Sequence, residues 1–215
     1  MGQAEVVDEL RAVPRPRARN PLESTDGRVR RGERNREAIA DALLALYEEG
    51  QYRPTARQVA ERAGVALRSV FQHYDSIDSL HEQVVLRHMQ QNSQILLPPR
   101  LGGDRSERLA TFVDYRVRMY EAIGPVRRAT VLGARESDLI LQVRARADTI
   151  MRAQVEAAFA PELALVPDRT ALLDALDWAL SWSSWDQLRT NQGLDVASAG
   201  ALIASVVERV LGAIR

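Results

Sequence analysis

Hydrophobic residues recur at steps of three and four along most of this chain, which is the spacing of one helix face. The first such stripe predicts an amphipathic helix over residues 34–49, which Gly50 ends. Its apolar positions are Ile39, Leu43, Leu46 and Tyr47. No segment alternates apolar and polar residues as a half-buried strand does. The pattern therefore predicts an all-α fold of about nine helices.

The segment 55–74, TARQVAERAGVALRSVFQHY, carries the most specific local pattern. Thr55 is a good N-cap, and Gly64 suits a corner because a left-handed backbone costs glycine nothing. Val70 then faces inward from a second short helix. The positions left outside are Leu67, Arg68, Ser69, Gln72 and His73. A short exposed helix braced at an angle by another helix is the geometry that enters a DNA major groove.

More helices are predicted further along the chain. Ser76 opens one that runs to about residue 91. The later ones are predicted at 106–123, 126–134, 137–159, 168–190 and 196–214. Gly124 and Pro125 are expected to end the first of these later helices, and residues 161–167 are expected to form a loop.

The predicted helix at 168–190 is apolar on two sides. Leu172, Leu176 and Leu180 fall on one side, and the three tryptophans fall about 150° away. These tryptophans are Trp178, Trp182 and Trp185. A helix with two apolar faces must be covered twice, so one face is expected to pack on a second copy of the chain.

Charge is unevenly distributed, although the 29 basic and 29 acidic residues cancel. Residues 11–36 carry nine Arg against three acidic residues, whereas residues 37–91 carry five Arg against eight. Residues 1–31 are expected to form a flexible, Arg-rich arm. This arm either contacts the phosphates or minor groove of DNA or is a solvated tail. Every basic residue is Arg, for which codon usage is the favoured explanation.

Composition excludes several classes of protein. The chain has no Cys, which excludes disulfides, zinc–thiolate sites and thiol nucleophiles. No apolar run approaches the roughly 18 residues of a membrane span, and the N-terminus lacks an apolar signal core. We therefore expect a cytoplasmic protein with no membrane partner, no cofactor and no bound metal. His81 and His88 are too far apart along one helix to share a metal and are expected to be a surface pair.

Residues 32–92 resemble the N-terminal domain of the TetR family of transcriptional regulators. The coinciding features are the Gly50 break, Thr55, the Ala63-Gly64-Val65 corner, and Val70-Phe71 with His73-Tyr74 before a new helix. The resemblance implies a flexible arm at 1–31, a helix-turn-helix DNA-binding domain at 32–92, and a helical effector-binding and dimerisation domain at 93–215. It also implies a homodimer through the last two helices. A dimer is required physically as well, because one short recognition helix reads too few bases.

The resemblance further implies which residues meet double-stranded operator DNA. Arg57 occupies a base-contacting position, where its fork suits guanine. Ala66 leaves the recognition helix without its usual side-chain cap, and Ile77 replaces a phosphate-binding Lys. The implied DNA-contacting set is Thr55, Ala56, Arg57, Leu67, Arg68, Ser69, Phe71, Gln72, His73 and Tyr74.

Members of this family usually bind a small molecule in the C-terminal domain, and the ligand releases the operator by linkage. The resemblance thus implies a small apolar or aromatic effector, whose identity stays open. Its candidate pocket residues are Met89, Phe112, Tyr115, Met119, Tyr120, Ile150, Trp178 and Trp182. No buried charge is predicted beside them. Solvated helix faces are expected to hold Arg116, Arg118, Asp114 and Glu121.

Two other functions stay open. A regulator of the same fold that activates transcription, or that ignores ligands, would keep the features above except the pocket or the repression. An enzyme would need paired carboxylates such as Glu136/Asp138 or Asp174/Asp177, but no His stands beside either pair and no nucleophile motif occurs. The expected protein is therefore a non-enzymatic repressor whose operator and regulated genes the sequence leaves open.

Overall fold

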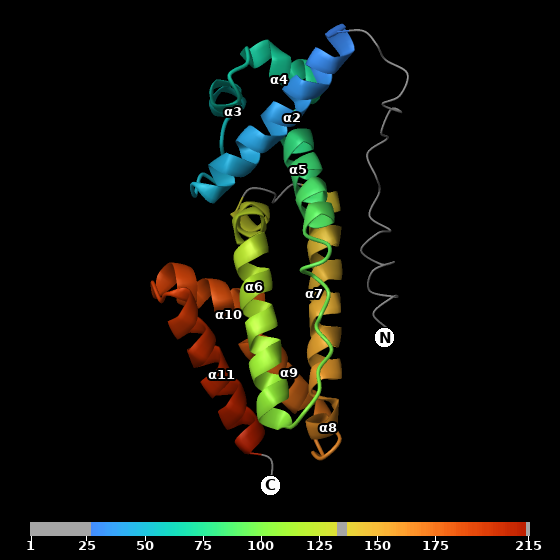
Figure 1. Ribbon diagram of the computed structural model, residues 1–215, viewed down its shortest axis with the longest axis vertical. Helices are drawn as coiled ribbons and strands as arrows, with labels where there is room; N and C mark the ends of the chain where they lie inside the picture. Colours follow the sequence, from blue (N-terminus) through green and yellow to red (C-terminus); the bar gives the residue numbers. More distant parts are fainter. Residues whose placement is uncertain (1–26, 133–136, 214–215) are drawn as a thin grey trace. The chain divides into compact units, whose positions relative to one another are not determined.

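The computed structural model of the protein describes residues 27–132 and 137–213, and every regular element in these ranges is a helix (Figure 1). The helices are α2 (Gly27–Glu48), α3 (Ala56–Ala63), α4 (Leu67–His73), α5 (Ile77–Gln91), α6 (Arg105–Leu132), α7 (Asp138–Ala158), α8 (Ala160–Leu163), α9 (Arg169–Ala179), α10 (Trp182–Asp186), a π-helical stretch at Gln187–Asn191 and α11 (Val196–Gly212). The predicted all-α fold is confirmed. None of these described helices has the length and apolar character that crossing a membrane requires.

One compact unit, here called the N-terminal unit, comprises the described residues within 27–93 and 123–143. In it, α2 packs against α3, α4 and α5. The predicted apolar stripe forms its core, because Ile39, Leu43, Leu46 and Tyr47 are nearly inaccessible to solvent. The same core includes Val126, Ala129 and Ile140. The unit therefore takes in the end of α6 and the start of α7, whereas the predicted DNA-binding domain is one continuous stretch.

A second compact unit, the C-terminal unit, comprises described residues 94–122 and 144–213. Here α9 packs against α8, α10 and α11. Its largest buried side chains include Phe112, Tyr120, Phe159 and Trp185. The rings of Phe112 and Phe159 meet edge to face with centroids 5.8 Å apart. Aromatic side chains from α6 and from the later helices thus form a large part of this core.

The expected helix break at Gly124-Pro125 is wrong. α6 continues from Arg105 to Leu132 with Pro125 inside it. A proline in a helix interior removes one backbone hydrogen bond and costs about 3 kcal/mol. Burial of Val126 and Ala129 in the N-terminal core offsets that cost, since burying a Val side chain contributes about 1.5–3 kcal/mol. The predicted helices at 106–123 and 126–134 are one helix as far as residue 132.

The predicted helix at 168–190 is also divided. Asp168 caps α9 as expected, accepting from the Ala171 amide at 2.9 Å. The helix then ends, and Ser181 adopts an extended backbone and caps α10 by accepting from the Ser184 amide. This break changes the direction of the side chains that follow. Trp182 and Trp185 are therefore buried within the C-terminal unit, and no continuous tryptophan face is left for a second copy.

The ends of several elements differ from their predicted positions. α2 begins at Gly27, so residues 27–31 of the predicted arm are helical. Residues 1–26, which make up the rest of the arm, lie outside the described residues. The short helix α8 occupies part of the predicted loop at 161–167. Gly193 has a φ of +68°, which separates α11 from the π-helical stretch as predicted.

Candidate nucleic-acid interface

The corner between α3 and α4 is held by local hydrogen bonds. The Thr55 hydroxyl accepts from the Gln58 amide at 3.3 Å, and the Gln58 side chain accepts from the Thr55 amide at 2.8 Å. This reciprocal pair is a capping box. Gly64 has φ 67° and ψ 30°, the left-handed conformation predicted for it. The Val65 amide then donates to the Ala60 carbonyl at 3.0 Å, which closes α3 and sets the direction of α4.

One residue anchors α4 inside the unit, and its other face is uncovered. Val70 is fully buried in the N-terminal core. Leu67 and Phe71, one turn apart, are 39% and 52% exposed. Arg68 and Gln72 are exposed beside them. Because apolar surface is solvated unfavourably, an exposed Leu–Phe pair on so short a helix indicates a surface suited to a partner.

Basic side chains near this face differ in what they already bind. Arg57 on α3 and Arg68 on α4 are exposed, and neither forms a hydrogen bond or ion pair with another residue that the structure describes. Arg62, also on α3, donates to Glu49 at 2.6 Å. Guanidinium groups without an acceptor are available to guanine edges or phosphates. Arg57 and Arg68 thus differ from Arg62 in that their guanidinium groups are not paired with a described residue.

Other residues of the predicted DNA-contacting set lie in mixed environments. Thr55 is exposed, whereas Ala56, Ser69 and His73 are half-buried. Tyr74 is only 4% exposed, and its hydroxyl donates to the Arg36 carbonyl at 3.0 Å. The Arg36 guanidinium also lies over the Tyr74 ring, 5.7 Å from its centroid. Tyr74 therefore braces the end of α4 against α2, and we do not propose it as a DNA contact.

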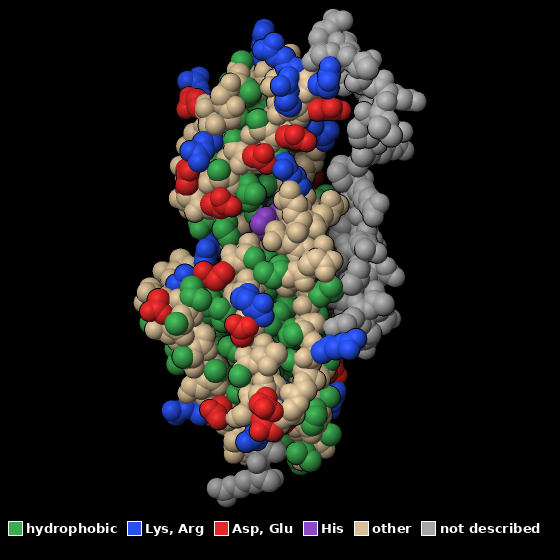
Figure 2. All heavy atoms as spheres, viewed as in Figure 1, with side chains coloured by type: hydrophobic (Ala, Val, Ile, Leu, Met, Phe, Trp, Pro, Cys, Tyr) green, Lys and Arg blue, Asp and Glu red, His purple; other side chains and the backbone are tan. Residues whose placement is uncertain are grey.

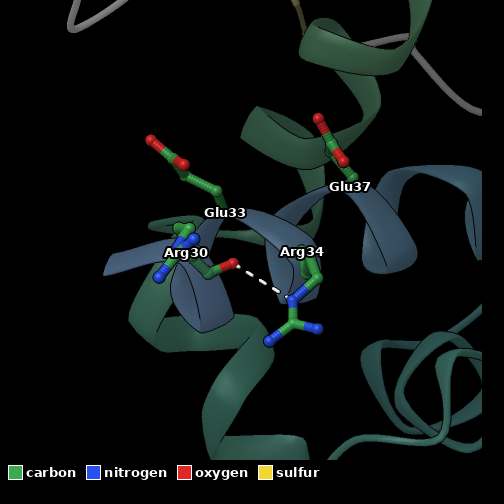
Figure 3. A pocket seen from close by; sticks show the side chains of 4 residues that line it. All are labelled: Arg30, Glu33, Arg34 and Glu37. Carbon is green, nitrogen blue, oxygen red and sulfur yellow. Dashed lines mark hydrogen bonds between the residues drawn. The ribbon is translucent and has the colours of Figure 1, made fainter. Parts of the chain in front are cut away.

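A hollow of about 430 Å³ lies along α2, lined by Arg30, Glu33, Arg34 and Glu37 (Figure 3). The Arg34 Nε donates to the Arg30 carbonyl at 3.4 Å. Two cations and two carboxylates leave this hollow without net charge. Figure 2 shows the same mixture of basic and acidic side chains over the visible face of the N-terminal unit. The described part of this face therefore carries no broad basic field.

Predicted effector-pocket residues divide into three groups. Met89 is half-buried and packs on the core of the N-terminal unit. Trp178, on α9, is 69% exposed. The remaining residues are buried in the C-terminal unit, namely Phe112, Tyr115, Met119, Tyr120, Ile150 and Trp182. Most of this last group lies along one face of α6 and packs in the core of that unit.

Tyr115 and Gln154 hold the irregular segment that precedes α6. The Tyr115 hydroxyl donates to the Leu96 carbonyl at 2.8 Å and lies 3.2 Å from the Gln154 side-chain oxygen. The Gln154 side-chain amide donates to the same carbonyl at 3.2 Å. Burial raises the pKa of Tyr115 to about 12, so this hydroxyl keeps its proton. α6, α7 and the segment at Leu96 thus share one hydrogen-bond network.

The expectation of a solvated helix face is wrong for Arg116, which is 2% exposed. Arg118 and Asp114 do form an exposed ion pair, at 2.9 Å. The sequence contained a signal for the difference. Position 116 lies four residues from both Phe112 and Tyr120, in the middle of the buried stripe of α6. A charged residue inside an apolar stripe is the residue that sequence reasoning should have singled out.

His81 and His88 are not the predicted surface pair, because both are buried in α5. The Tyr47 hydroxyl forms a hydrogen bond with Nδ1 of His81. Burial lowers the pKa of His81 and raises that of Tyr47, so both groups are neutral near pH 7. Within residues 27–132 and 137–213, no group of three or more His, Asp and Glu side chains is placed to hold a metal ion.

Of the two carboxylate pairs considered for an enzyme, the structure describes one completely. Asp174 and Asp177 both bind Arg152 in an ion-pair cluster on the C-terminal unit. Their carboxylates are thereby engaged with a cation. Glu136, of the other pair, lies outside the described residues.

Comparison with known proteins places this fold. No protein-family model and no curated protein matches the chain. A crystal structure of a transcriptional regulator from Rhodococcus sp. Rha1 matches with a TM-score of 0.61 and 18% identity, over 82% of this chain and 96% of that one. A putative transcriptional regulator from Pseudomonas aeruginosa PAO1 matches with a TM-score of 0.56 and 17% identity, over 91% of this chain and 99% of that one. The chain shares the fold of these helical regulators.

Proposed function

We propose that this protein is a sequence-specific DNA-binding transcriptional regulator of the TetR type. The observation that carries the proposal is the outward face of α4, where exposed Leu67 and Phe71 flank Arg68. A short helix held by a capped α3 and a glycine corner has the geometry that docks in a major groove. The fold shared with two proteins named as transcriptional regulators supports the same proposal.

Each exposed group has a distinct role in this proposal. Thr55 and Ala56 lie beside a phosphate at the start of α3, and the Ala56 amide donates to it. The uncommitted guanidinium groups of Arg57 and Arg68 donate to guanine edges or to flanking phosphates. Leu67 and Phe71 contact thymine methyl groups. Polar contacts to the DNA backbone come from Ser69, Gln72 and His73.

Two such units are needed to read a palindrome, and we propose a homodimer through the last helices. α11 turns Ala199, Ile203, Val207 and Leu211 inward. A second apolar stripe of Leu202, Val206 and Val210 lies about a quarter turn away, and Leu202 is 41% exposed. This stripe, together with exposed Trp178, replaces the tryptophan face as the surface that needs a partner.

A double substitution on that stripe tests the dimer. Leu202→Glu with Val206→Glu places two carboxylates on the outer face of α11 and should convert the protein to a monomer. Sedimentation velocity of the full chain measures this directly. Glu208→Gln, at an exposed position of α11, is the control and should leave the dimer intact. A dimer that survives the double substitution would move the interface elsewhere.

The dimer acts, in this proposal, as a repressor released by a small molecule in the C-terminal unit. A ligand that binds the non-operator conformation more tightly lowers DNA affinity by its differential affinity for the two states. A regulator that activates transcription, or responds to no ligand, is the alternative. Reporter expression with and without the regulator distinguishes repression from activation.

The DNA-binding proposal is tested by fluorescence anisotropy with duplexes from the region upstream of the coding sequence. Arg57→Ala and Arg68→Ala should each weaken binding by about 5–150-fold, because a bidentate base contact contributes about 1–3 kcal/mol. Arg62→Ala is the matched control, since its guanidinium is already paired with Glu49. Equal affinities for all four proteins, or equal affinity for a scrambled duplex, would reject the proposal.

A further inference from the structure

Arg116 is a buried cation whose hydrogen-bonding capacity is largely unused. Its Nη2 donates to the Met151 carbonyl at 2.6 Å. Its Nε and Nη1 have no hydrogen-bond partner among the residues that the structure describes. Arg is always charged in proteins, so this group cannot avoid the cost of burial by losing its proton. A buried charge of this kind requires compensation from its surroundings.

Aromatic rings supply part of that compensation. The guanidinium carbon lies 4.9 Å from the centroid of the Phe112 ring, 5.8 Å from that of Tyr115 and 5.9 Å from that of Tyr120. Such rings attract the cation through their negative faces. The N–H groups of the guanidinium, however, require acceptors with lone pairs. The face of an aromatic ring is a poor substitute for such an acceptor. The surroundings therefore hold the charge without satisfying its donors.

Other arginines of the C-terminal unit differ from Arg116 in having a carboxylate partner. Arg108 is paired with the buried carboxylate of Glu162, although the Arg108 Nε has no partner of its own, and Arg189 donates to Glu121 at 3.1 Å. Arg152 binds two aspartates. No carboxylate pairs with Arg116 among the described residues. An anion able to accept hydrogen bonds would both satisfy these donors and balance the buried charge.

We propose that Arg116 binds the carboxylate of a small effector with an apolar body. A planar carboxylate matches the donors of a guanidinium, and the surrounding rings suit an apolar or aromatic remainder. This inference rests on the proposed function, because it names the ligand class for the same C-terminal unit. The sequence predicted no buried charge beside the candidate pocket residues, and the buried Arg116 departs from that expectation.

The position of Arg116 connects such a ligand to the segment before α6. Arg116 contacts Met151 of α7, and Gln154, one turn further along α7, binds the Leu96 carbonyl. Tyr115, next to Arg116, donates to the same carbonyl. A carboxylate entering beside Arg116 would therefore act on the bonds that hold the Leu96 segment. That segment follows α5 of the N-terminal unit in the chain.

The test uses the full chain and measures thermal stability with matched probes. Benzoate, phenylacetate and octanoate are compared with benzamide, phenylacetamide and octanamide, which keep each apolar body and lack the charge. At least one acid at ten times its Kd should raise the Tm by about 3–6 °C, and its amide should not. Arg116→Met should abolish the shift. Arg118→Met, which removes an exposed guanidinium of the same helix, should retain it.

The Arg116→Met protein could lose the shift through misfolding, so Arg116→Lys is tested as well. Lysine keeps the positive charge but lacks the planar group that binds a carboxylate through two parallel hydrogen bonds. It should reduce the acid-specific shift without removing the helical circular dichroism. Equal shifts with acids and amides, no shift with any acid, or an undiminished shift in both Arg116 variants would overturn the inference.

The same proteins keep the two proposals separate. If the chain binds its upstream duplex through Arg57 and Arg68 but shows no acid-specific shift, the effector inference fails alone. If an acid-specific shift depends on Arg116 but no duplex is preferred, the inference stands as a ligand site and the regulator proposal fails.

Discussion

Both units contain guanidinium groups with unused donors, but in opposite environments. Arg57 and Arg68 of the N-terminal unit are exposed, whereas Arg116 of the C-terminal unit is 2% exposed and surrounded by aromatic rings. Water satisfies exposed donors at little cost. Arg57 and Arg68 are therefore stable when unbound and remain accessible to a large partner such as a duplex. A buried cation carries an effective penalty of several kcal/mol. This contrast is the reason why we propose a small anionic partner for Arg116 and a duplex for Arg57 and Arg68.

This difference also predicts different sensitivities. Contacts at an exposed surface are lost one at a time when a side chain is truncated, and the fold survives. Contacts inside a core are coupled to packing, so substitution changes stability as well as binding. Four substitutions in the N-terminal unit test the contributions of burial, backbone conformation, capping and protonation to its stability.

The largest effect is expected at the anchor of α4. Val70→Asp buries an unpaired carboxylate in the N-terminal core and should destabilise that unit by about 4 kcal/mol or more. DNA binding should disappear, while the acid-specific response of the C-terminal unit remains. Urea unfolding followed by circular dichroism measures the loss. Phe71→Asp, at the neighbouring 52% exposed position, should keep the fold, and equal stability losses for the two variants would contradict the assigned orientation of α4.

A smaller effect is expected at the glycine corner. Gly64 has φ 67° with open space where a Cβ would lie, so only backbone strain opposes substitution. Gly64→Ala should cost about 1–2 kcal/mol of stability and weaken DNA binding. Gly212→Ala, in helical backbone with equal space, is the control and should be neutral or stabilising. A Gly64→Ala protein with unchanged stability and DNA affinity would show that the turn between α3 and α4 does not require a left-handed residue.

The missing cap of α4 offers a gain rather than a loss. Ala66 precedes α4 in extended backbone and makes no side-chain hydrogen bond to it. Ala66→Ser supplies a hydroxyl for the free amides and should stabilise the N-terminal unit by about 0.5–1 kcal/mol. Thermal unfolding with Ala197→Ser, an exposed site inside the first turn of α11, as control measures the gain. No difference between the two serines would mean that water already satisfies the start of α4.

The smallest effect concerns pH. Burial lowers the pKa of His81 in the folded protein, whereas in the unfolded chain it titrates near its ordinary value of about 6.5. The unfolded state therefore takes up protons first as the pH falls. The stability present above about pH 6.5 is lost as the pH falls toward the lowered pKa of folded His81. His81→Gln should flatten this dependence in urea titrations between pH 7.5 and about 5.5, and an unchanged slope would remove His81 as its cause.

The sequence was sufficient for local features and insufficient where packing decides. The Thr55 cap and the Gly64 corner were predictable because each depends on a few neighbouring residues. The continuation of α6 through Pro125 was not, because burial in a distant core outweighs a local penalty. The break before Ser181 was missed because a helical wheel assumes an unbroken helix. It placed the tryptophans on one face, although Trp178 is exposed and Trp185 is buried.

The candidate site divides in the same way. The exposure of Leu67, Arg68 and Gln72 could be predicted because position on a short helix decides exposure, whereas Ser69 and His73 of the same set are half-buried. Arg116 and His81 were misplaced because residue type was given more weight than spacing. In both cases the polar residue falls within an apolar stripe, so spacing was the stronger guide.

The most direct test of the central claim is selection of binding sites from random duplexes by the full chain. We predict enrichment of a twofold-symmetric sequence whose half-sites are about 10 base pairs apart or a multiple of that distance. We also predict that Arg68→Ala relaxes the preference at one position in each half-site. Absence of any enriched sequence, or a sequence preference identical in the Arg68→Ala protein, would contradict the assignment of α4 as the helix that reads DNA.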